Sequence, residues 1–229
     1  MRDPIIEASN LVKTFNSGGP FELRVLCGVD LKVFPNSAIG ITGSSGAGKT
    51  TLLSCLSLLD APTSGSLSFF GQPAQFLTEG AQSVLRREKL AFIFQDFQLF
   101  EDLPAWLNVC VGRFVEKASL RQLHWQAIET LEQVELQARA DHLARLLSGG
   151  EKQRLAFARA IARAPEILLA DEPTSNLDPD TAKLLTSRLQ RYLEQGGTLV
   201  AASHDPAVIS LCREVYELSE GRLRKATQA

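Results

Sequence analysis

The sequence has few residues of the kinds that bind metals through nitrogen or sulfur. Of its 229 residues, three are histidines and four are cysteines. No two cysteines form a CxxC pair, and no metal-ligand spacing relates the histidines, which are His124, His142 and His204. The pattern argues against a zinc site or a disulfide framework. We expect free thiols in a reducing compartment at Cys27, Cys55, Cys110 and Cys212.

Long apolar runs and a strong charge are also lacking. Nowhere do about 18 apolar residues follow one another, so we expect no membrane-spanning helix. The first ten residues, "MRDPIIEASN", lack the apolar core of a secretory signal. The formal net charge is only -2, which gives no basic footprint, and we expect no nucleic-acid partner. With 45% hydrophobic residues, the composition is that of an ordinary globular domain with a sizeable core.

The pattern of apolar residues predicts three kinds of region. Alternation over the first 35 residues, with the turn "NSGGP" inside it, indicates antiparallel strands. Short apolar runs at 38–42 and 90–95, and later "EILLADEP" and "TLVAASHD", indicate buried strands that alternate with helices. Residues 96–164 have a helical period, and the last strands form a hairpin around Glu220 and Gly221. We therefore expect one α/β domain over 1–229 with a mostly parallel sheet. Its core is 1–95 and 165–229 with an N-terminal antiparallel β-subdomain, and 96–164 is an inserted helical subdomain.

A glycine-rich stretch, "GSSGAGKT", joins a predicted strand to a predicted helix. It satisfies G-x-x-x-x-G-K-[ST], in which consecutive backbone amides cradle phosphate oxygens at a helix N-terminus. Lys49 is expected to reach the β- and γ-phosphates, and the Thr50 hydroxyl a Mg²⁺ ion. A dinucleotide fingerprint is excluded, because no third glycine follows Gly48 at the required spacing. The candidate nucleotide-binding residues here are Gly43, Ser44, Ser45, Gly46, Ala47, Gly48, Lys49, Thr50 and Thr51.

Two adjacent carboxylates end the apolar run "ILLADEP". Asp171 and Glu172 fall at the carboxyl tip of a strand, where open α/β sheets place their ligands. Asp171 suits the Mg²⁺ shell, and Glu172 suits a general base that orients an attacking water. The alternative is a pair of solvated carboxylates, which does not explain their position after the run or the proline that follows.

A second glycine-rich stretch, "LSGGEKQ", precedes a strongly helical sequence. Ser148 with Glu151 three residues later predicts a capping box at the helix N-terminus. A capping box does not require Gly149 and Gly150, which cost conformational entropy. A helix N-terminus without Cβ atoms suits an anion that approaches closely.

"LSGGEKQ" resembles the signature motif of the ATP-binding-cassette ATPases, and the other motifs of that family follow in order. Gln95 of "IFQDF" matches the Q-loop, "SNLD" at 175–178 the D-loop, and "SHD" at 203–205 the histidine switch. Phe15 of "LVKTF" matches the aromatic residue that stacks on adenine. The resemblance covers essentially the whole chain. It implies the P-loop NTPase (RecA-like) fold and ATP hydrolysis with Mg²⁺ as cofactor.

In this family two subunits pack head to tail, so the resemblance implies a homodimer with two shared sites. Ser148, Gly149 and Gly150 then bind the γ-phosphate of ATP held by the partner copy. His204 contacts the γ-phosphate within its own copy, and Gln95 senses Mg²⁺ beside Thr50 and Asp171. The catalytic set is Glu172, His204 and Lys49, and Asp178 crosses the interface toward the partner's P-loop.

The stretches "LLDAPTSGSLSFFGQ" and "LRREKLAFIFQDFQLF" resemble the lipoprotein-release and macrolide-export group. This implies an integral membrane permease as partner, and a cytoplasmic chain peripheral to the inner face of the cytoplasmic membrane. Polar-amino-acid importers and cell-division ATPases share part of this pattern. Soluble cassette ATPases of DNA repair or translation, and small-molecule P-loop kinases, are further alternatives.

Some positions depart from the family pattern. Asn36 replaces a glycine before the P-loop strand, and we expect it to adopt a left-handed turn. Arg213 and Glu214 stand in the order opposite to that usual in the group, which a swapped salt bridge would explain. The aromatic side chains after the Q-loop have two interpretations, a docking surface for the membrane partner or core packing; they are Phe97, Phe100 and Trp106.

Overall fold

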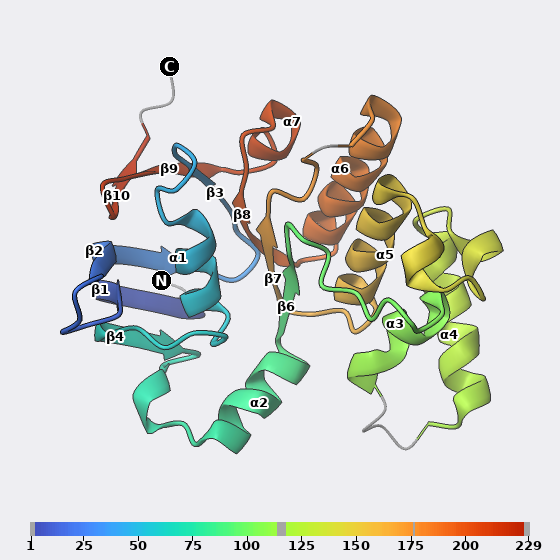
Figure 1. Ribbon diagram of the computed structural model, residues 1–229, viewed down its shortest axis with the longest axis horizontal. Coiled ribbons are helices and arrows are strands. Elements are labelled where there is room, and N and C mark those ends of the chain that lie inside the picture. Colours follow the sequence, from blue (N-terminus) through green and yellow to red (C-terminus); the bar gives the residue numbers. More distant parts are fainter. Residues whose placement is uncertain (1–2, 114–117, 176, 227–229) are drawn as a thin grey trace.

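The computed structural model describes residues 3–113, 118–175 and 177–226. Within these residues the strands form two sheets (Figure 1). The first has the order β2-β1-β4-β5, is antiparallel throughout, and consists of β1 (Ile6–Phe15), β2 (Leu23–Val33), β4 (Ser64–Phe69) and β5 (Gln72–Pro73). The expected N-terminal antiparallel sheet is confirmed.

The second sheet has the order β10-β9-β3-β8-β7-β6. Its strands are β3 (Ala38–Thr42), β6 (Leu90–Ile93), β7 (Ile167–Asp171), β8 (Thr198–Ala202), β9 (Glu214–Ser219) and β10 (Arg222–Lys225). Every neighbouring pair is parallel except the predicted hairpin of β9 and β10. The mostly parallel α/β sheet predicted from the sequence is confirmed.

Alternate side chains of the central strands enter two different cores. On β7, Ile167 and Leu169 pack with the apolar side chains of the antiparallel sheet and of α1 (Lys49–Leu56). Leu168 and Ala170 face the opposite way and pack with the helices on the far side of the sheet. The strand is buried on both faces, which is why it reads as a continuous apolar run.

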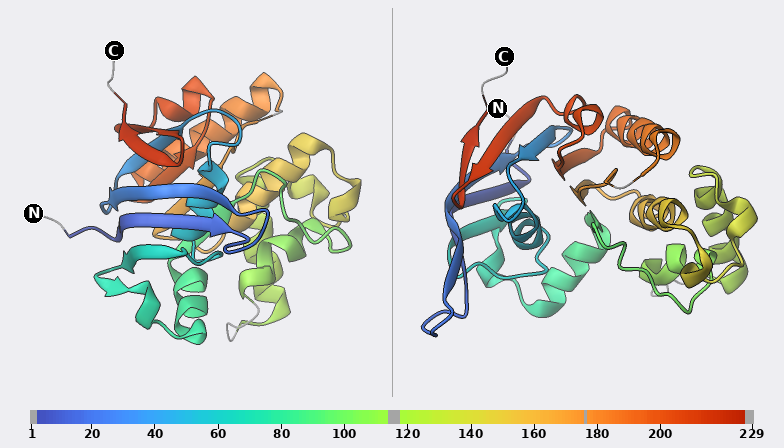
Figure 2. Two further views of the ribbon diagram at one scale, coloured as in Figure 1. Left: turned by 60° about the vertical axis from the view of Figure 1, so that its left-hand side comes forward. Right: turned by 45° about the horizontal axis from the view of Figure 1, so that its top comes forward.

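Helices dominate the described residues between 96 and 164. They are α3 (Ala105–Cys110), α4 (Leu120–Glu132) and α5 (Gly149–Ile161), with short 3₁₀ turns at Val111–Arg113, Gln137–Arg139 and Ala144–Leu146. Residues 114–117 of the proposed helical subdomain lie outside the described residues. In Figures 1 and 2, α3, α4 and α5 lie together on one side of the parallel sheet. Helix α5 also packs against β6 and α6 (Pro179–Glu194), which connects this block to the sheet.

Other elements were not predicted from the sequence. Helix α2 (Glu79–Glu88) precedes β6, a 3₁₀ turn spans Ala74–Phe76, and α7 (Pro206–Ile209) follows β8. No side chain of α2 is fully buried: Leu85 packs partly buried against the core, and Val84 is exposed. Among the described residues, no helix has both the length and the apolar character needed to cross a membrane.

The departures from the family pattern have specific outcomes. Asn36 has the left-handed conformation expected of it, with φ 60°. Glu214 accepts hydrogen bonds from Lys225 Nζ at 2.8 Å and from the Tyr216 hydroxyl at 3.0 Å, so Lys225, not Arg213, supplies its salt bridge. Trp106 is partly buried in the core and meets His124 edge-on with ring centroids 4.9 Å apart, whereas Phe100 remains 51% exposed.

The topology aligns three carboxyl ends at one edge of the parallel sheet. Ile41 at the end of β3 pairs with Ala202 at the end of β8, and Asp171 at the end of β7 pairs with the same Ala202. The segments that follow β3, β7 and β8 therefore converge. They carry the glycine-rich loop, the Asp171–Glu172 pair and His204.

Candidate nucleotide site

The glycine-rich loop between β3 and α1 has a backbone that other residues could not adopt. Gly43 has φ 144°, and a Cβ there would lie 2.2 Å from the Leu218 carbonyl oxygen. Gly48 has φ 102°, and a Cβ there would lie 2.8 Å from a methyl group of Val25. The loop thus curls tightly beneath the helix N-terminus, in the arrangement that presents backbone amides to an anion.

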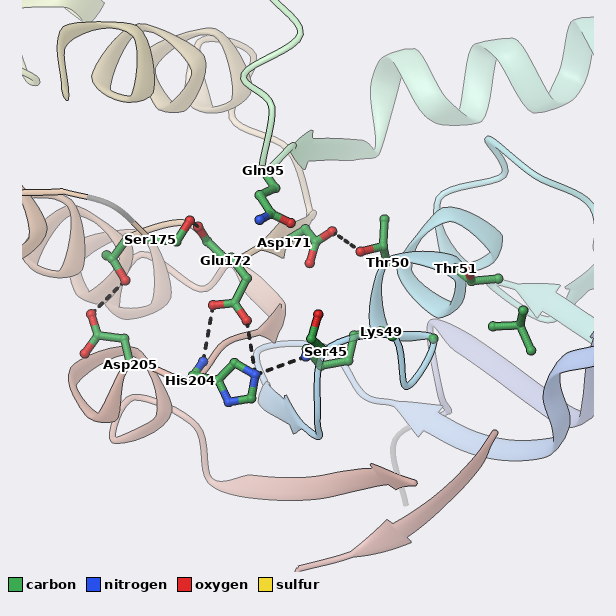
Figure 3. A pocket seen from close by; sticks show the side chains of 14 residues that line it. Ser45, Lys49, Thr50, Thr51, Gln95, Asp171, Glu172, Ser175, His204 and Asp205 are labelled. Carbon is green, nitrogen blue, oxygen red and sulfur yellow. Dashed lines mark hydrogen bonds and ion pairs between the residues drawn. The ribbon is translucent and has the colours of Figure 1, made fainter. Parts of the chain in front are cut away.

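Lys49 is the first residue of α1, and its side chain turns back over the loop. Only 8% of Lys49 is exposed. Its Nζ donates a hydrogen bond to the Gly43 carbonyl at 2.7 Å and lies 3.1 Å from His204 Nε2 (Figure 3). The loop carbonyl and His204 thus hold the ammonium group at the mouth of the loop.

Thr50 and Asp171 meet directly above the loop. The Thr50 hydroxyl donates to Asp171 Oδ2 at 2.6 Å, and Asp171 is 2% exposed. Burial raises the pKa of Asp171, an effect opposed by the Thr50 hydrogen bond and the charge of Lys49. A carboxylate held in this way gains from a nearby cation. The Gln95 side chain points toward the same pair in Figure 3.

Glu172 begins the turn after β7 with a left-handed backbone, φ 46°. Its amide donates to the Ala202 carbonyl at 2.8 Å, and its Oε2 accepts from the His204 amide at 3.3 Å. Its Oε1 lies 3.7 Å from His204 Nε2. A non-glycine residue in this conformation costs of order 1–3 kcal/mol, and such residues cluster at functional sites.

These groups line one cavity of about 620 Å³. The sequence-predicted residues in its lining are Ser45, Gly46, Gly48, Lys49, Thr50, Thr51, Gln95, Asp171, Glu172 and His204. Ser175, from the D-loop motif, lines it as well. Asp205, from the "SHD" motif, also lines it, and so do Val25 and Thr174, which were not singled out from the sequence. The Thr174 hydroxyl donates to Asp205 Oδ2 at 2.7 Å.

Gly43, Ser44 and Ala47 belong to the same loop without lining the cavity. Phe15 lies at the end of β1, is 39% exposed, and has Lys13 Nζ 5.0 Å from its ring centre. Asp178 caps α6, since its Oδ1 accepts from the Thr181 amide at 3.0 Å. Asn176 of the D-loop motif lies outside the described residues.

The residues Ser148–Gly150 are likewise not part of the cavity lining. Ser148 caps α5, and the predicted capping box is present: its hydroxyl accepts from the Glu151 amide at 3.3 Å, and its amide donates to Glu151 Oε2 at 2.8 Å. A Cβ on Gly150 would lie 3.7 Å from Asp178 Oδ2, an ordinary contact. The N-termini of α5 and α6 therefore lie side by side.

The fold of this chain does not itself require the two signature glycines. Neither Gly149 nor Gly150 has a left-handed backbone. A Cβ on Gly149 would have no heavy atom within 4 Å in the described part of the chain. The bare backbone at the start of α5 is therefore explained neither by local conformation nor by packing within one copy.

Together the fold and the cavity define a P-loop nucleotide hydrolase. The family described as "ABC transporter" matches residues 26–175, and the chain belongs to this family. It is the ATP-binding, ATP-hydrolysing subunit of a membrane ABC transporter. Its group includes the ATP-binding protein LolD of lipoprotein-releasing systems and the macrolide export protein MacB.

Similar proteins span the chain almost completely. The lipoprotein-releasing system ATP-binding protein LolD of Bordetella pertussis is 40% identical over 222 residues, 96% of each chain. The LolD of Protochlamydia amoebophila is 41% identical, again over 96% of each. The macrolide export ATP-binding/permease protein MacB of Hahella chejuensis is 35% identical, with 97% of this chain covering 34% of that protein. The dimeric ATP-binding cassette MJ0796, solved in a post-hydrolysis state with ADP and Pi, has a TM-score of 0.91 and 32% identity over 97% of this chain and 98% of that one.

Proposed function

We propose that this chain hydrolyses ATP jointly with a second copy of itself. Each nucleotide lies between the glycine-rich loop of one copy and Ser148–Gly150 of the other. The observation that carries the proposal is the bare start of α5, whose glycines the fold of a single copy does not require. The similar ATP-binding cassette MJ0796, which is dimeric in its post-hydrolysis structure with ADP and Pi, supports it.

Within one copy, the cavity residues divide the chemistry among them. The loop amides and Lys49 bind the phosphates. Thr50, Asp171 and Gln95 would hold a Mg²⁺ ion, because hydroxyl, carboxylate and amide oxygens are hard ligands of the kind that Mg²⁺ prefers, and those of Thr50 and Asp171 lie 2.6 Å apart. When bound, the ion would supply positive charge to the phosphate oxygens.

Glu172 and His204 act where the bond is cleaved. Glu172 orients the attacking water and accepts its proton, a role that suits a carboxylate held at the edge of the cavity by the His204 amide. His204 contacts the γ-phosphate, and its Nε2 already lies 3.1 Å from Lys49 Nζ. Phe15, exposed at the end of β1, stacks on the adenine.

The second copy completes the site from outside. Ser148, Gly149 and Gly150 bring the N-terminus of α5 to the partner's γ-phosphate, where backbone amides and the helix dipole stabilise negative charge. Asp178 lies beside Gly150 and reaches toward the partner's glycine-rich loop.

ATP binding and hydrolysis drive a conformational change in an integral membrane permease that binds this chain. We place the chain in the cytoplasm, peripherally on the inner face of the cytoplasmic membrane. Its similarity over 96% of both lengths to LolD proteins, the ATP-binding proteins of lipoprotein-releasing systems, supports lipoprotein release as the transport process. Phe100, exposed just after the Q-loop, fits a contact with this permease.

The substitution Gly150→Ala tests the shared site. Alanine favours the helix and fits the space inside one copy, where its Cβ makes only ordinary contacts at 3.7 Å. We expect ATP binding to a single copy to be unchanged within about twofold. ATP turnover should fall about 100-fold, because the added methyl group would keep the partner's γ-phosphate from the amides at the start of α5, with an effect as large as the loss of a charge-stabilising donor. Steady-state ATP hydrolysis measures the turnover, and titration of a single copy with nucleotide measures the binding.

Gly80→Ala is the matched control. Gly80 is also the second residue of its helix, α2, behind a capping residue, Thr78, and its Cβ would lie 3.9 Å from the Thr78 hydroxyl. We expect this variant to hydrolyse ATP at the wild-type rate. Wild-type turnover by Gly150→Ala at every protein concentration would refute the shared site.

A further inference from the structure

The turn that carries Glu172 is held by strand β8, by hydrogen bonds within the turn and by the start of α7. The Glu172 amide is bound to Ala202 of β8, and the Glu172 carbonyl accepts from the Ser175 amide at 3.1 Å and the Ser175 hydroxyl at 3.0 Å. The Thr174 hydroxyl is bound to Asp205 at the start of α7. These contacts fix the turn relative to the nucleotide cavity of its own copy.

One buried side chain reaches the same turn from α5. Gln153 lies three residues after Gly150 and is 1% exposed. Its Nε2 donates to the Pro173 carbonyl at 2.7 Å, and Pro173 directly follows Glu172. A single hydrogen bond thus connects the helix that begins with Ser148–Gly150 to the peptide next to the proposed base.

Stability does not explain the Gln153 amide. Its Oε1 is buried and has no hydrogen-bond partner among the described residues. An unpaired buried acceptor is destabilising, and an apolar side chain of similar size would avoid that cost. The Gln153 amide is therefore explained by the hydrogen bond that its N–H donates to the Pro173 carbonyl.

We infer that Gln153 is a positioning residue for ATP hydrolysis. It holds the Pro173 carbonyl, and so fixes the direction in which Glu172 leaves the turn. Because it lies one turn along α5 from Gly150, it also carries the position of the helix N-terminus to Glu172. When the start of α5 contacts the partner's nucleotide, Gln153 therefore orients Glu172 of the copy to which α5 belongs. This inference rests on the proposed shared site.

The substitutions Gln153→Leu and Gln153→Met test it. Both side chains are of similar size and lack an N–H donor, and methionine can follow the path of glutamine through the core. We expect kcat to fall about tenfold and KM for ATP to stay within about twofold, because the base is misplaced while binding is intact. The control is Lys152→Gln, which removes only the contact between Lys152 and Glu101 at 3.2 Å and should keep wild-type kcat.

A merely structural role would lower the melting temperature without changing kcat, and that result overturns the inference. Loss of the cooperative melting transition in both variants also overturns it, since the contact would then serve folding. The Glu172→Gln background separates the two proposals. ATP-dependent dimers that form with and without Gln153→Leu leave the shared site standing whatever kcat shows, whereas a Glu172→Gln chain that stays monomeric with ATP refutes the shared site itself.

Discussion

At the scale of single residues, Glu151 shows how Ser148, the residue before the two signature glycines, is held within one copy. Its Oε2 accepts from the Ser148 amide, and its Oε1 accepts from Arg139 Nε at 3.0 Å. The Ser148 amide is the largest cause of a lowered pKa at Glu151, and Arg139 and the Ser148 hydroxyl add to it. A carboxyl group with a lowered pKa in the folded state stabilises that state while it is ionised, and the contribution is lost as the pH falls.

Glu151→Gln keeps the capping box, since glutamine can fill this position, but removes the charge. We expect the free energy of unfolding to drop by about 0.5–1 kcal/mol at pH 7, the value of a partly exposed ion pair. The difference should begin to shrink as the pH falls below the ordinary carboxyl pKa of 4.5 and should vanish once the pH is below the lowered pKa of Glu151 in the folded state. Urea unfolding of both proteins at pH 7 and at a pH below the lowered pKa of Glu151 measures the difference. Glu132→Gln, at the exposed end of α4, is the control, and an undiminished difference at low pH would contradict the assignment.

At the scale of elements, the sequence predicted best what is buried on both faces. Strands β7 and β8 are buried at all five positions, so their apolar runs are unambiguous. Helix α2 was missed because its apolar side chains are few and none is fully buried, and the cavity wall at Val25 and Thr174 was missed because it depends on packing between distant segments. The bond from Gln153 to Pro173 joins residues 20 apart, and no local pattern encodes such a contact.

Helix α5 is also anchored near its C-terminal end. Arg159 donates through Nη2 to the Phe97 carbonyl at 2.7 Å and through Nη1 to the Gln98 carbonyl. Phe97 and Gln98 both have left-handed backbones, with φ 59° and 50°. Burial lowers the pKa of the Arg159 guanidinium. Its planar fork of N–H groups binds two adjacent backbone carbonyls at once. The turn after Gln95 is thereby tied to the same helix that carries Ser148 and Gln153.

Arg159→Lys keeps the charge and loses the fork. We expect the free energy of unfolding to fall by about 1–2 kcal/mol, since one charged hydrogen bond is lost. Amide hydrogen exchange of residues 96–99 should quicken. Arg145→Lys is the matched control: Arg145 pairs with Asp102 at 3.3 Å on an exposed surface, where such pairs contribute little. Equal effects of the two substitutions would show that the Arg159 fork has no special part in holding the turn.

At the scale of the whole molecule, one copy holds two incomplete halves. The cavity is lined by the residues proposed to bind and cleave ATP, and Ser148–Gly150 are not among its lining residues. The start of α5 has backbone amides and, at Gly149, open space in the described part of the chain, whereas Lys49 and Glu172 line the separate cavity. In the proposed dimer, two copies related by a twofold axis would complete both halves at once, because each copy of an isologous pair presents the same surface to the other.

Mixing two inactive variants tests this arrangement directly. Lys49→Ala removes the phosphate-binding ammonium and leaves Ser148–Gly150 intact, whereas Gly150→Ala does the reverse. In a mixed dimer, one site combines both defects, and the other combines the intact loop of the Gly150→Ala copy with the intact signature of its partner. Equal mixing at protein concentrations that favour dimers should therefore restore about a quarter of the wild-type turnover, since half of the dimers are mixed and each has one good site. If each copy used its own glycines for its own nucleotide, no mixture could regain activity, because every copy would carry a defect in its only site.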